Sequence, residues 1–305
     1  MEYKRLISVL LLTSGLLFSC QEVPKSPSHA KKVISVTYSV LGALVKELVG
    51  DDFTVKVLIP NGLDVHEWEP SAKDMETLFS SSLIVENGLG LEGGLSKTLE
   101  QARNSGIPIF TASDHINVRR VGKGEGIPSE DPDQALGAQD PHLWTDPLTL
   151  KSILQALGDQ LEITFKIDLK NQKAALSHRL TILDSSLRSQ VELIPENQRN
   201  LVTGHESLGY FAQAYGFKLV GAIIPSLNTQ AEVSAAEMAK LKVLIQENQV
   251  KVIFTEIGTP PKVAQALAQD AGVKTVEIHT HLVPPDGSYF TLMSELATAI
   301  TQSLK

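Results

Sequence analysis

The chain has 305 residues and a formal net charge of −8, and 42% of its residues are hydrophobic while only 5% are aromatic. A single core stops growing at about this size, so we expect two lobes. Lys and Arg are scattered instead of forming a basic stripe, which argues against nucleic acid as a partner.

Residues 1–19 have the pattern of a secretory signal peptide, in which two basic residues precede an apolar run over residues 6–18. The run is shorter than the roughly 20 residues that cross a bilayer. Leu17-Phe18-Ser19-Cys20 resembles a bacterial lipobox, in which Cys20 becomes the lipidated first residue. An ordinary signal peptide with an incidental cysteine is the alternative. We therefore predict an extracytoplasmic lipoprotein, in the periplasm or on the cell surface, with residues 20–31 as its lipidated tether.

Short β-branched runs alternate with helical patterns through residues 32–165, the expected N-terminal lobe. Strands are predicted at 32–37, 54–59, 83–87 and 108–111, and helices at 41–49, 71–80 and 91–104. Such alternation, with few aromatic residues, favours a parallel sheet of about four strands flanked by helices. The Gly- and Pro-rich acidic segment 121–138 predicts a mobile loop that does not pack.

Two long helical patterns follow, at 147–165 and 168–193. The second places apolar residues at spacings of three and four, so residues 166–194 are predicted to form one rigid linking helix. The C-terminal lobe, residues 195–305, repeats the alternation, with strands at 200–203, 218–224, 250–256 and 273–278 and helices at 207–215, 232–247, 260–271 and 289–303. The prediction is an α/β fold of two pseudo-symmetric lobes with a site in the cleft between them.

Four of the eight histidines come after a predicted strand or in a turn-rich segment: His66, His142, His205 and His281. In open parallel sheets, ligands bind outside the carboxyl ends of the strands, so these side chains are expected to converge. Neutral imidazole suits Zn²⁺, which favours closed tetrahedral shells of four ligands. Mn²⁺, the alternative, prefers oxygen-rich shells. The four histidines are therefore the predicted metal ligands.

Several segments resemble the TroA-like, or cluster A-I, family of zinc and manganese ABC-transporter substrate-binding lipoproteins (ZnuA-type). The matching segments are Ile59-Pro60-Asn61-Gly62 with His66-Glu67-Trp68-Glu69-Pro70, Asn87-Gly88-Leu89-Gly90-Leu91-Glu92, Asp140-Pro141-His142-Leu143-Trp144, Thr203-Gly204-His205, and Phe254-Thr255-Glu256. The resemblance implies two lobes joined by a long helix, metal bound between them, and delivery of that metal to the permease of an ABC importer by a monomer that is not an enzyme.

The same resemblance bears on the identity of the ligands. The family's third ligand is generally His in zinc binders, which His205 matches, and its fourth is usually Asp. Here Glu277-Ile278-His279-Thr280-His281 stands in that place. We expect His281 to be the fourth ligand, with His279 or Asp286 as alternatives.

Each ligating imidazole is expected to donate its second N–H to an acceptor, and Glu69, Asp146 and Glu256 are the candidates. Helix capping or surface charge is the other interpretation of these carboxylates. A secreted zinc-dependent hydrolase is an alternative function, although the sequence contains no H-E-x-x-H. A surface adhesin is another. The G-x-G-x-x-G pattern at residues 88–93 is interpreted as a tight turn and not as a dinucleotide site.

Overall fold

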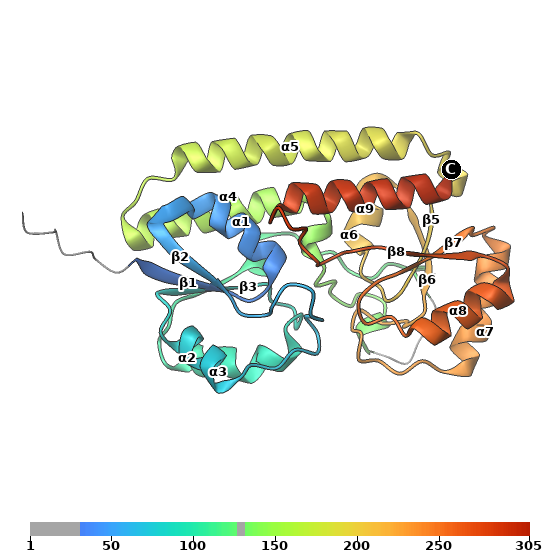
Figure 1. Cartoon of the computed structure of the whole chain (residues 1–305), viewed down its shortest axis with the longest axis horizontal. Coiled ribbons are helices and arrows are strands. Elements are labelled where there is room, and N and C mark those ends of the chain that lie inside the picture. The colour runs from blue at the N-terminus through green and yellow to red at the C-terminus, as the bar shows by residue number, and fades with distance from the viewer. Residues whose placement is uncertain (1–30, 127–131) are drawn as a thin grey trace, which may run out of the picture. The chain divides into compact units, whose positions relative to one another are not determined.

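The computed structural model describes residues 31–126 and 132–305 (Figure 1). The predicted signal peptide, Cys20 and all but the last residue of the tether lie outside these residues. Within the described part of the chain, no helix has the length and apolar character needed to cross a membrane.

The first lobe contains one parallel sheet with the strand order β2-β1-β3-β4. Its strands are β1 (Lys32–Val36), β2 (Phe53–Val57), β3 (Leu83–Glu86) and β4 (Ile109–Thr111), and they are connected through α1 (Ser39–Val49), α2 (Ala72–Phe79) and α3 (Ser96–Asn104). This order confirms the predicted sheet. β2 lies on one side of β1, and β3 and β4 lie on the other, so the strand order reverses between β1 and β3. Open α/β sheets bind ligands at such a switch point.

Two long helices follow, α4 (Pro147–Phe165) and α5 (Lys170–Glu192). Asp146 starts α4 by accepting from the N–H groups of Leu148 and Thr149. α5 contacts α1 and α4 as well as α6 (Gly209–Tyr215) and α9 (Tyr289–Leu304). It therefore runs along elements from both halves of the sequence, as Figure 1 shows.

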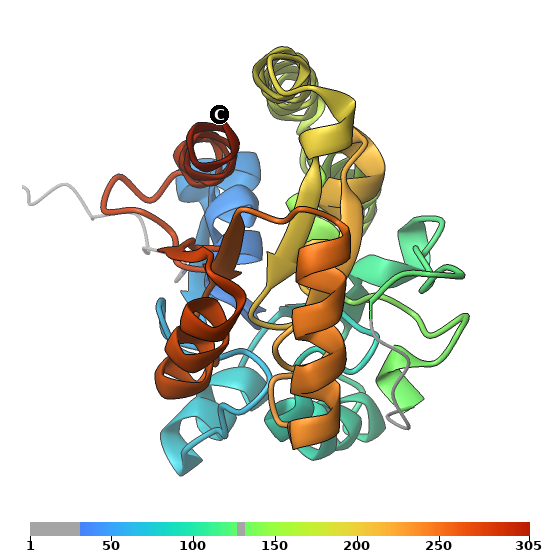
Figure 2. The same ribbon diagram turned by 90° about the vertical axis from the view of Figure 1, so that its right-hand side faces the viewer.

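The second lobe has four strands, as expected, but they pair differently from the prediction. The strands β5 (Asn200–Thr203), β6 (Lys218–Ala222), β7 (Val252–Thr255) and β8 (Lys274–Glu277) form two parallel pairs, β5-β6 and β7-β8. β5 lies beside β7 without joining it in a ladder. The β5-β6 pairing shifts its register between Leu201 and Val202, which pair with Leu219 and Gly221, so Val220 of β6 is the extra residue of a bulge. In Figure 2, α7 (Ala235–Glu247) and α8 (Pro261–Ala271) lie below these strands, while α5 and α9 lie above them.

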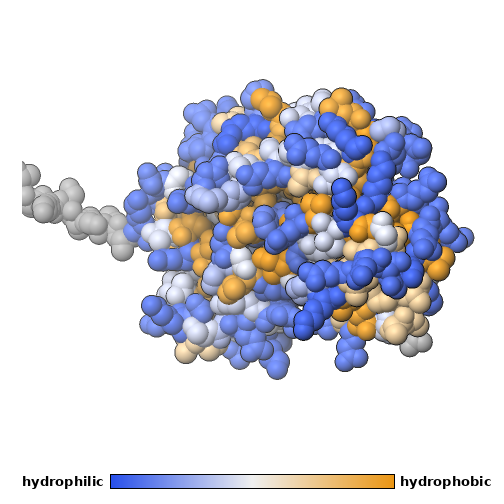
Figure 3. Space-filling view, turned by 45° about the vertical axis from the view of Figure 1, so that its right-hand side comes forward, coloured by the Kyte–Doolittle hydropathy of each residue, from blue (hydrophilic) through white to orange (hydrophobic). Residues whose placement is uncertain are grey.

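Most buried apolar residues belong to one continuous cluster. It includes Ile34 and Val85 of the first sheet, Leu187 of α5, Phe254 of β7 and Ile300 of α9. A smaller cluster fills the space between the strands of the second lobe and the helices α7 and α8. The two lobes thus share a core along α5 and α9. Outside the core, apolar and hydrophilic residues are interspersed on the face drawn in Figure 3.

The segment 121–138 packs more than its composition predicts. Val121 is buried, and its N–H donates to the carbonyl of Ala138 at 2.9 Å. Gln134 is also buried, and Arg119 forms an ion pair with Glu125. These described residues therefore depart from the expectation of an unpacked loop, because they are held by long-range contacts that composition does not reveal. Residues 127–131 lie outside the description, and the mobility of the segment stays a prediction.

Candidate metal centre

Three of the predicted histidines, His66, His142 and His205, meet at one buried point. Nε2 of His142 lies 3.4 Å from Nε2 of His66 and 3.2 Å from Nε2 of His205. One ring nitrogen from each residue lies within 4.8 Å of the others. Two nitrogens that each bind one tetrahedral zinc ion at about 2.0 Å lie about 3.3 Å apart, so these separations suit a shared cation.

The same type of turn, closed by an Asp side chain, orients two of these histidines. Oδ1 of Asp64 accepts the backbone N–H of His66 at 2.9 Å, and Oδ1 of Asp140 accepts the backbone N–H of His142 at 3.0 Å. An Asp that accepts from the backbone two residues later forms an Asx turn, which fixes a loop without regular structure. Each histidine is thereby held on a short, defined loop.

His281 lies beside the three but outside their close group. It is buried, and its Nε2 has no hydrogen-bond partner among the described residues. Oγ1 of Thr280 lies 3.0 Å from its Nδ1. The hydroxyl of Thr280 donates to Glu256, whose carboxylate also contacts the ring of His205, so His281 follows directly after a residue at the edge of the site. A buried nitrogen without a partner is costly, and a metal ion would satisfy it.

The structure does not bring His279 or Asp286 to this point. β8 ends at Glu277, so the alternation of a strand no longer determines where His279 lies, and this residue is exposed. Asp286 is also exposed, and its carboxylate accepts from the N–H of Ser288 and the hydroxyl of Thr291 at the start of α9. Both alternatives for the fourth ligand therefore lie away from the cluster.

Two carboxylates lie beside the ring nitrogens that face away from the centre of the cluster. Oδ1 of Asp140 lies 2.9 Å from Nδ1 of His142, and Oε1 of Glu256 lies 3.1 Å from Nδ1 of His205. Glu256 also accepts from the hydroxyls of Ser207 and Thr280, each at 2.6 Å. Such outer acceptors fix the orientation of a metal-binding imidazole and raise its basicity.

Only one of the three acceptors expected from the sequence has that position, namely Glu256. Asp146 caps α4, and Glu69 is exposed on the loop after His66. Asp140 was missed as an acceptor, although it belongs to the Asp140-Pro141-His142 motif. Its place two residues before a candidate ligand, shared by Asp64, is the signal in the sequence that identifies it.

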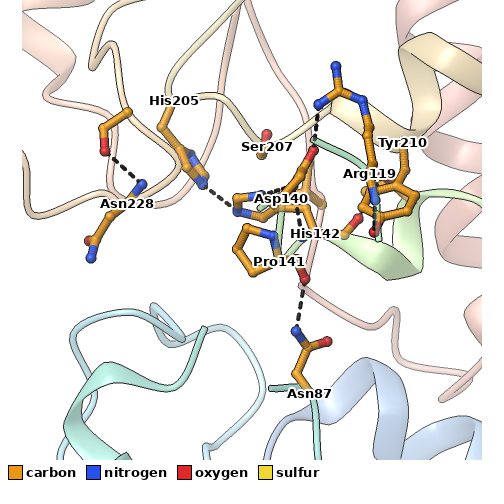
Figure 4. Close-up of polar contacts among 12 residues, drawn as sticks. Asn87, Arg119, Asp140, Pro141, His142, His205, Ser207, Tyr210 and Asn228 are labelled. Carbon is orange, nitrogen blue, oxygen red and sulfur yellow. Dashed lines mark hydrogen bonds and ion pairs between the residues drawn. The ribbon is translucent and has the colours of Figure 1, made fainter. Parts of the chain in front are cut away.

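The segment that carries His142 is held from two sides, as Figure 4 shows. Nη1 of Arg119 donates to Oδ2 of Asp140 at 3.0 Å, and both side chains are buried. On the other side, Nδ2 of Asn87 donates to the carbonyl of Pro141 at 2.9 Å. His142 is therefore fixed through both its backbone and its ring.

Burial and nearby charge set the protonation of the cluster. Burial lowers the pKa of His66 and that of His142 and brings the pKa of His281 down to about 4. Burial opposes charge on His205 as well, but the neighbouring Glu256 outweighs it and raises the pKa of His205. Burial likewise disfavours a charged Glu256, yet His205 and the two hydroxyls lower its pKa to about 2. Near neutral pH, His66, His142 and His281 keep a free lone pair.

The glycine-rich turn after β3 serves packing. A Cβ atom at Gly93 would lie 3.1 Å from the carbonyl oxygen of His66, and one at Gly94 would overlap the carbonyl of Trp68. Glycine lets the backbone of the turn approach the His66 loop closely. This supports the interpretation of the G-x-G-x-x-G pattern as a tight turn.

Comparisons with known proteins agree with this geometry. The family model described as the periplasmic component A of the zinc-uptake complex, ZnuA, matches residues 34–303. The high-affinity zinc uptake system protein ZnuA of Bacillus subtilis (strain 168) is 30% identical over 81% of this chain and 77% of its own length. The manganese-binding lipoprotein MntA of Halalkalibacterium halodurans is 27% identical over 84% of this chain and 81% of its own.

Among solved structures, the periplasmic zinc-binding protein TroA from Treponema pallidum is similar, with a TM-score of 0.75 and 25% identity. The match covers 90% of this chain and 99% of that chain. The α/β fold predicted from the sequence is thus confirmed. Because the family model covers nearly all of the described residues, the chain belongs to the ZnuA family of periplasmic components of metal-uptake complexes.

Proposed function

We propose that this protein captures zinc outside the cytoplasm and delivers it to the membrane permease of an ABC importer. Its family consists of binding components of metal importers and not of enzymes, and its relatives include binders of zinc and of manganese. The observation that supports zinc is the buried cluster of His66, His142 and His205, with His281 beside it. Nitrogen ligands favour zinc, whereas manganese prefers carboxylate and water oxygens.

The proposed shell consists of these four imidazoles, with Asp140 and Glu256 as outer acceptors. Four protein ligands close a tetrahedral shell, and closed zinc sites hold the ion, whereas catalytic sites keep one position open for water. This favours a carrier over the zinc-dependent hydrolase that the sequence left as an alternative. The ion is cargo, so the shell has to release it as well as bind it.

We further propose that Cys20 carries a lipid that anchors the mature protein to a membrane, and that the protein acts as a monomer. The lipobox-like sequence before Cys20 supports the anchor, as does the description of relatives as lipoproteins. Two or three acyl chains hold a protein on a membrane durably, at about 0.8 kcal/mol for each buried methylene.

The test is metal titration of the protein after removal of metal with a chelator. We expect one zinc ion per chain, bound more tightly than manganese. Replacing His66, His142, His205 or His281 by Ala should each weaken zinc binding by more than about 100-fold, the upper range for loss of an outer acceptor. His279→Ala is the matched control, because His279 is exposed two residues from His281. Tighter binding of manganese, or full zinc affinity in the four variants, would contradict the proposal.

A further inference from the structure

The loop that carries His66 is tied directly to the segment that carries His281. Nδ2 of Asn61 donates to the carbonyl of Val283 at 2.7 Å, and the N–H of Val283 donates back to Oδ1 of Asn61 at 2.8 Å. The side-chain amide therefore pairs with the backbone as a second peptide group would. Asn61 stands five residues before His66, and Val283 stands two residues after His281.

Other side chains of the first lobe hold the same segment. Nε1 of Trp144 donates to the carbonyl of Thr280 at 2.6 Å, and Oγ of Ser39 donates to the carbonyl of His281 at 3.2 Å. Residues 280–283 lie between β8 and α9 in the sequence. Their backbone groups nevertheless form hydrogen bonds with side chains that precede α4. The position of His281 thus depends on both lobes.

Asn61 differs from the other two residues in its exposure. Trp144 is fully buried and packs against Tyr38, with ring centroids 5.1 Å apart, so its replacement would disturb the core. Asn61 is exposed, so water or a docked protein can reach its bridge to Val283 without entering the core. Its two hydrogen bonds are partly buried, whereas that of Trp144 is buried, so the bridge of Asn61 opens more easily than the contact of Trp144.

Resting on the proposed function, we propose that Asn61 is a positioning residue that sets how fast the site releases its metal. It holds Val283, which stands two residues after His281, and thereby restrains the segment of His281. The three close imidazoles leave a tetrahedral ion one ligand short, and His281 has the buried nitrogen without a partner that can complete the shell. Opening the bridge removes one of the three connections that hold the segment of His281, while the hydrogen bonds that hold His142 remain.

The experiment compares Asn61→Ala with Asn200→Ala in the full chain. Asn200 is a matched control, because its side-chain amide likewise makes two hydrogen bonds to the backbone, donating to the carbonyls of Asn197 and Asn248, but within the second lobe. Zinc release is timed by stopped-flow capture with an excess of chelator, and zinc association is timed separately. Visible absorption of the Co²⁺-loaded protein reports the coordination of the ion.

For Asn61→Ala we expect zinc release about tenfold faster, as loss of two partly buried hydrogen bonds predicts, with unchanged association. Its cobalt spectrum should shift toward that of His281→Ala, a change that a merely structural defect would not produce. A wild-type release rate and spectrum in Asn61→Ala would overturn the inference alone, as would equal acceleration in Asn200→Ala. Absence of zinc binding by the wild-type chain would overturn the proposed function and, with it, the role of Asn61.

Discussion

Replacing Asp140 by Asn tests how the site holds its metal. Asp140 is fully buried and accepts three hydrogen bonds, from the backbone and ring of His142 and from Arg119. Asn keeps the size of the side chain but carries no charge. Its NH₂ group cannot accept a hydrogen bond, so it has to face either the ring of His142 or the guanidinium of Arg119, and that hydrogen bond is lost. Loss of one charge-assisted bond costs about 1.5–3 kcal/mol of stability in the metal-free protein. Loss of an outer carboxylate should weaken zinc binding about 10- to 100-fold.

Zinc affinity is measured by competition with a fluorescent chelator, and stability by urea unfolding of the metal-free protein. Asp146→Asn is the control, because Asp146 lies in the same segment but caps α4. That variant should lose about 1 kcal/mol of stability and keep its zinc affinity. If Asp140→Asn binds zinc as tightly as the wild type, or if both variants lose affinity equally, the assignment of Asp140 as an outer acceptor is wrong.

Three further predictions concern other parts of the chain. Burial raises the pKa of Glu92 from 4.5 to about 7, so the folded protein keeps a proton on this residue that the unfolded chain loses, and the contribution of Glu92 to stability falls as the pH rises from 4.5 to 7. Glu92→Gln should remove this contribution, so urea unfolding of the metal-free proteins should show the variant gaining stability relative to the wild type between pH 4.5 and 7; a difference that does not change with pH would contradict this. Gly94→Ala places a Cβ atom against the carbonyl of Trp68 and should lower both zinc affinity and, by about 1–3 kcal/mol, stability, which titration and urea unfolding measure. Cys20→Ser should move the protein from the membrane fraction to the aqueous fraction, and its retention in the membrane fraction would refute lipid anchoring.

The sequence predicted the positions of the elements well, because the patterns that determine them are local. The strands before His66 and His205 and the long helix at 170–192 were predicted to within a few residues. Convergence of the histidines followed from one general rule about the carboxyl ends of parallel strands. His281 was the least certain of the four from sequence, and it lies outside the close group in the structure.

Features that depend on contacts distant in sequence were harder to predict. The second sheet splits into the pairs β5-β6 and β7-β8, and which strands pair depends on contacts between distant segments that the composition of each strand does not reveal. The packing of Val121 depends on a backbone partner seventeen residues away, Ala138. Asp146 is different, because an Asp immediately before a helix that begins with Pro is a typical N-cap, and the sequence alone supported that interpretation.

The apolar core that continues along α5 and α9 limits how this carrier can exchange its ion. Swinging the halves apart would expose side chains such as Leu187 and Ile300, and each Å² of apolar surface brought into water costs about 25 cal/mol. Rearranging a short loop costs only a few hydrogen bonds, each worth about 1 kcal/mol. A transporter that unloads this protein therefore needs to supply only a small mechanical displacement, and most of the molecule can stay the same whether loaded or empty.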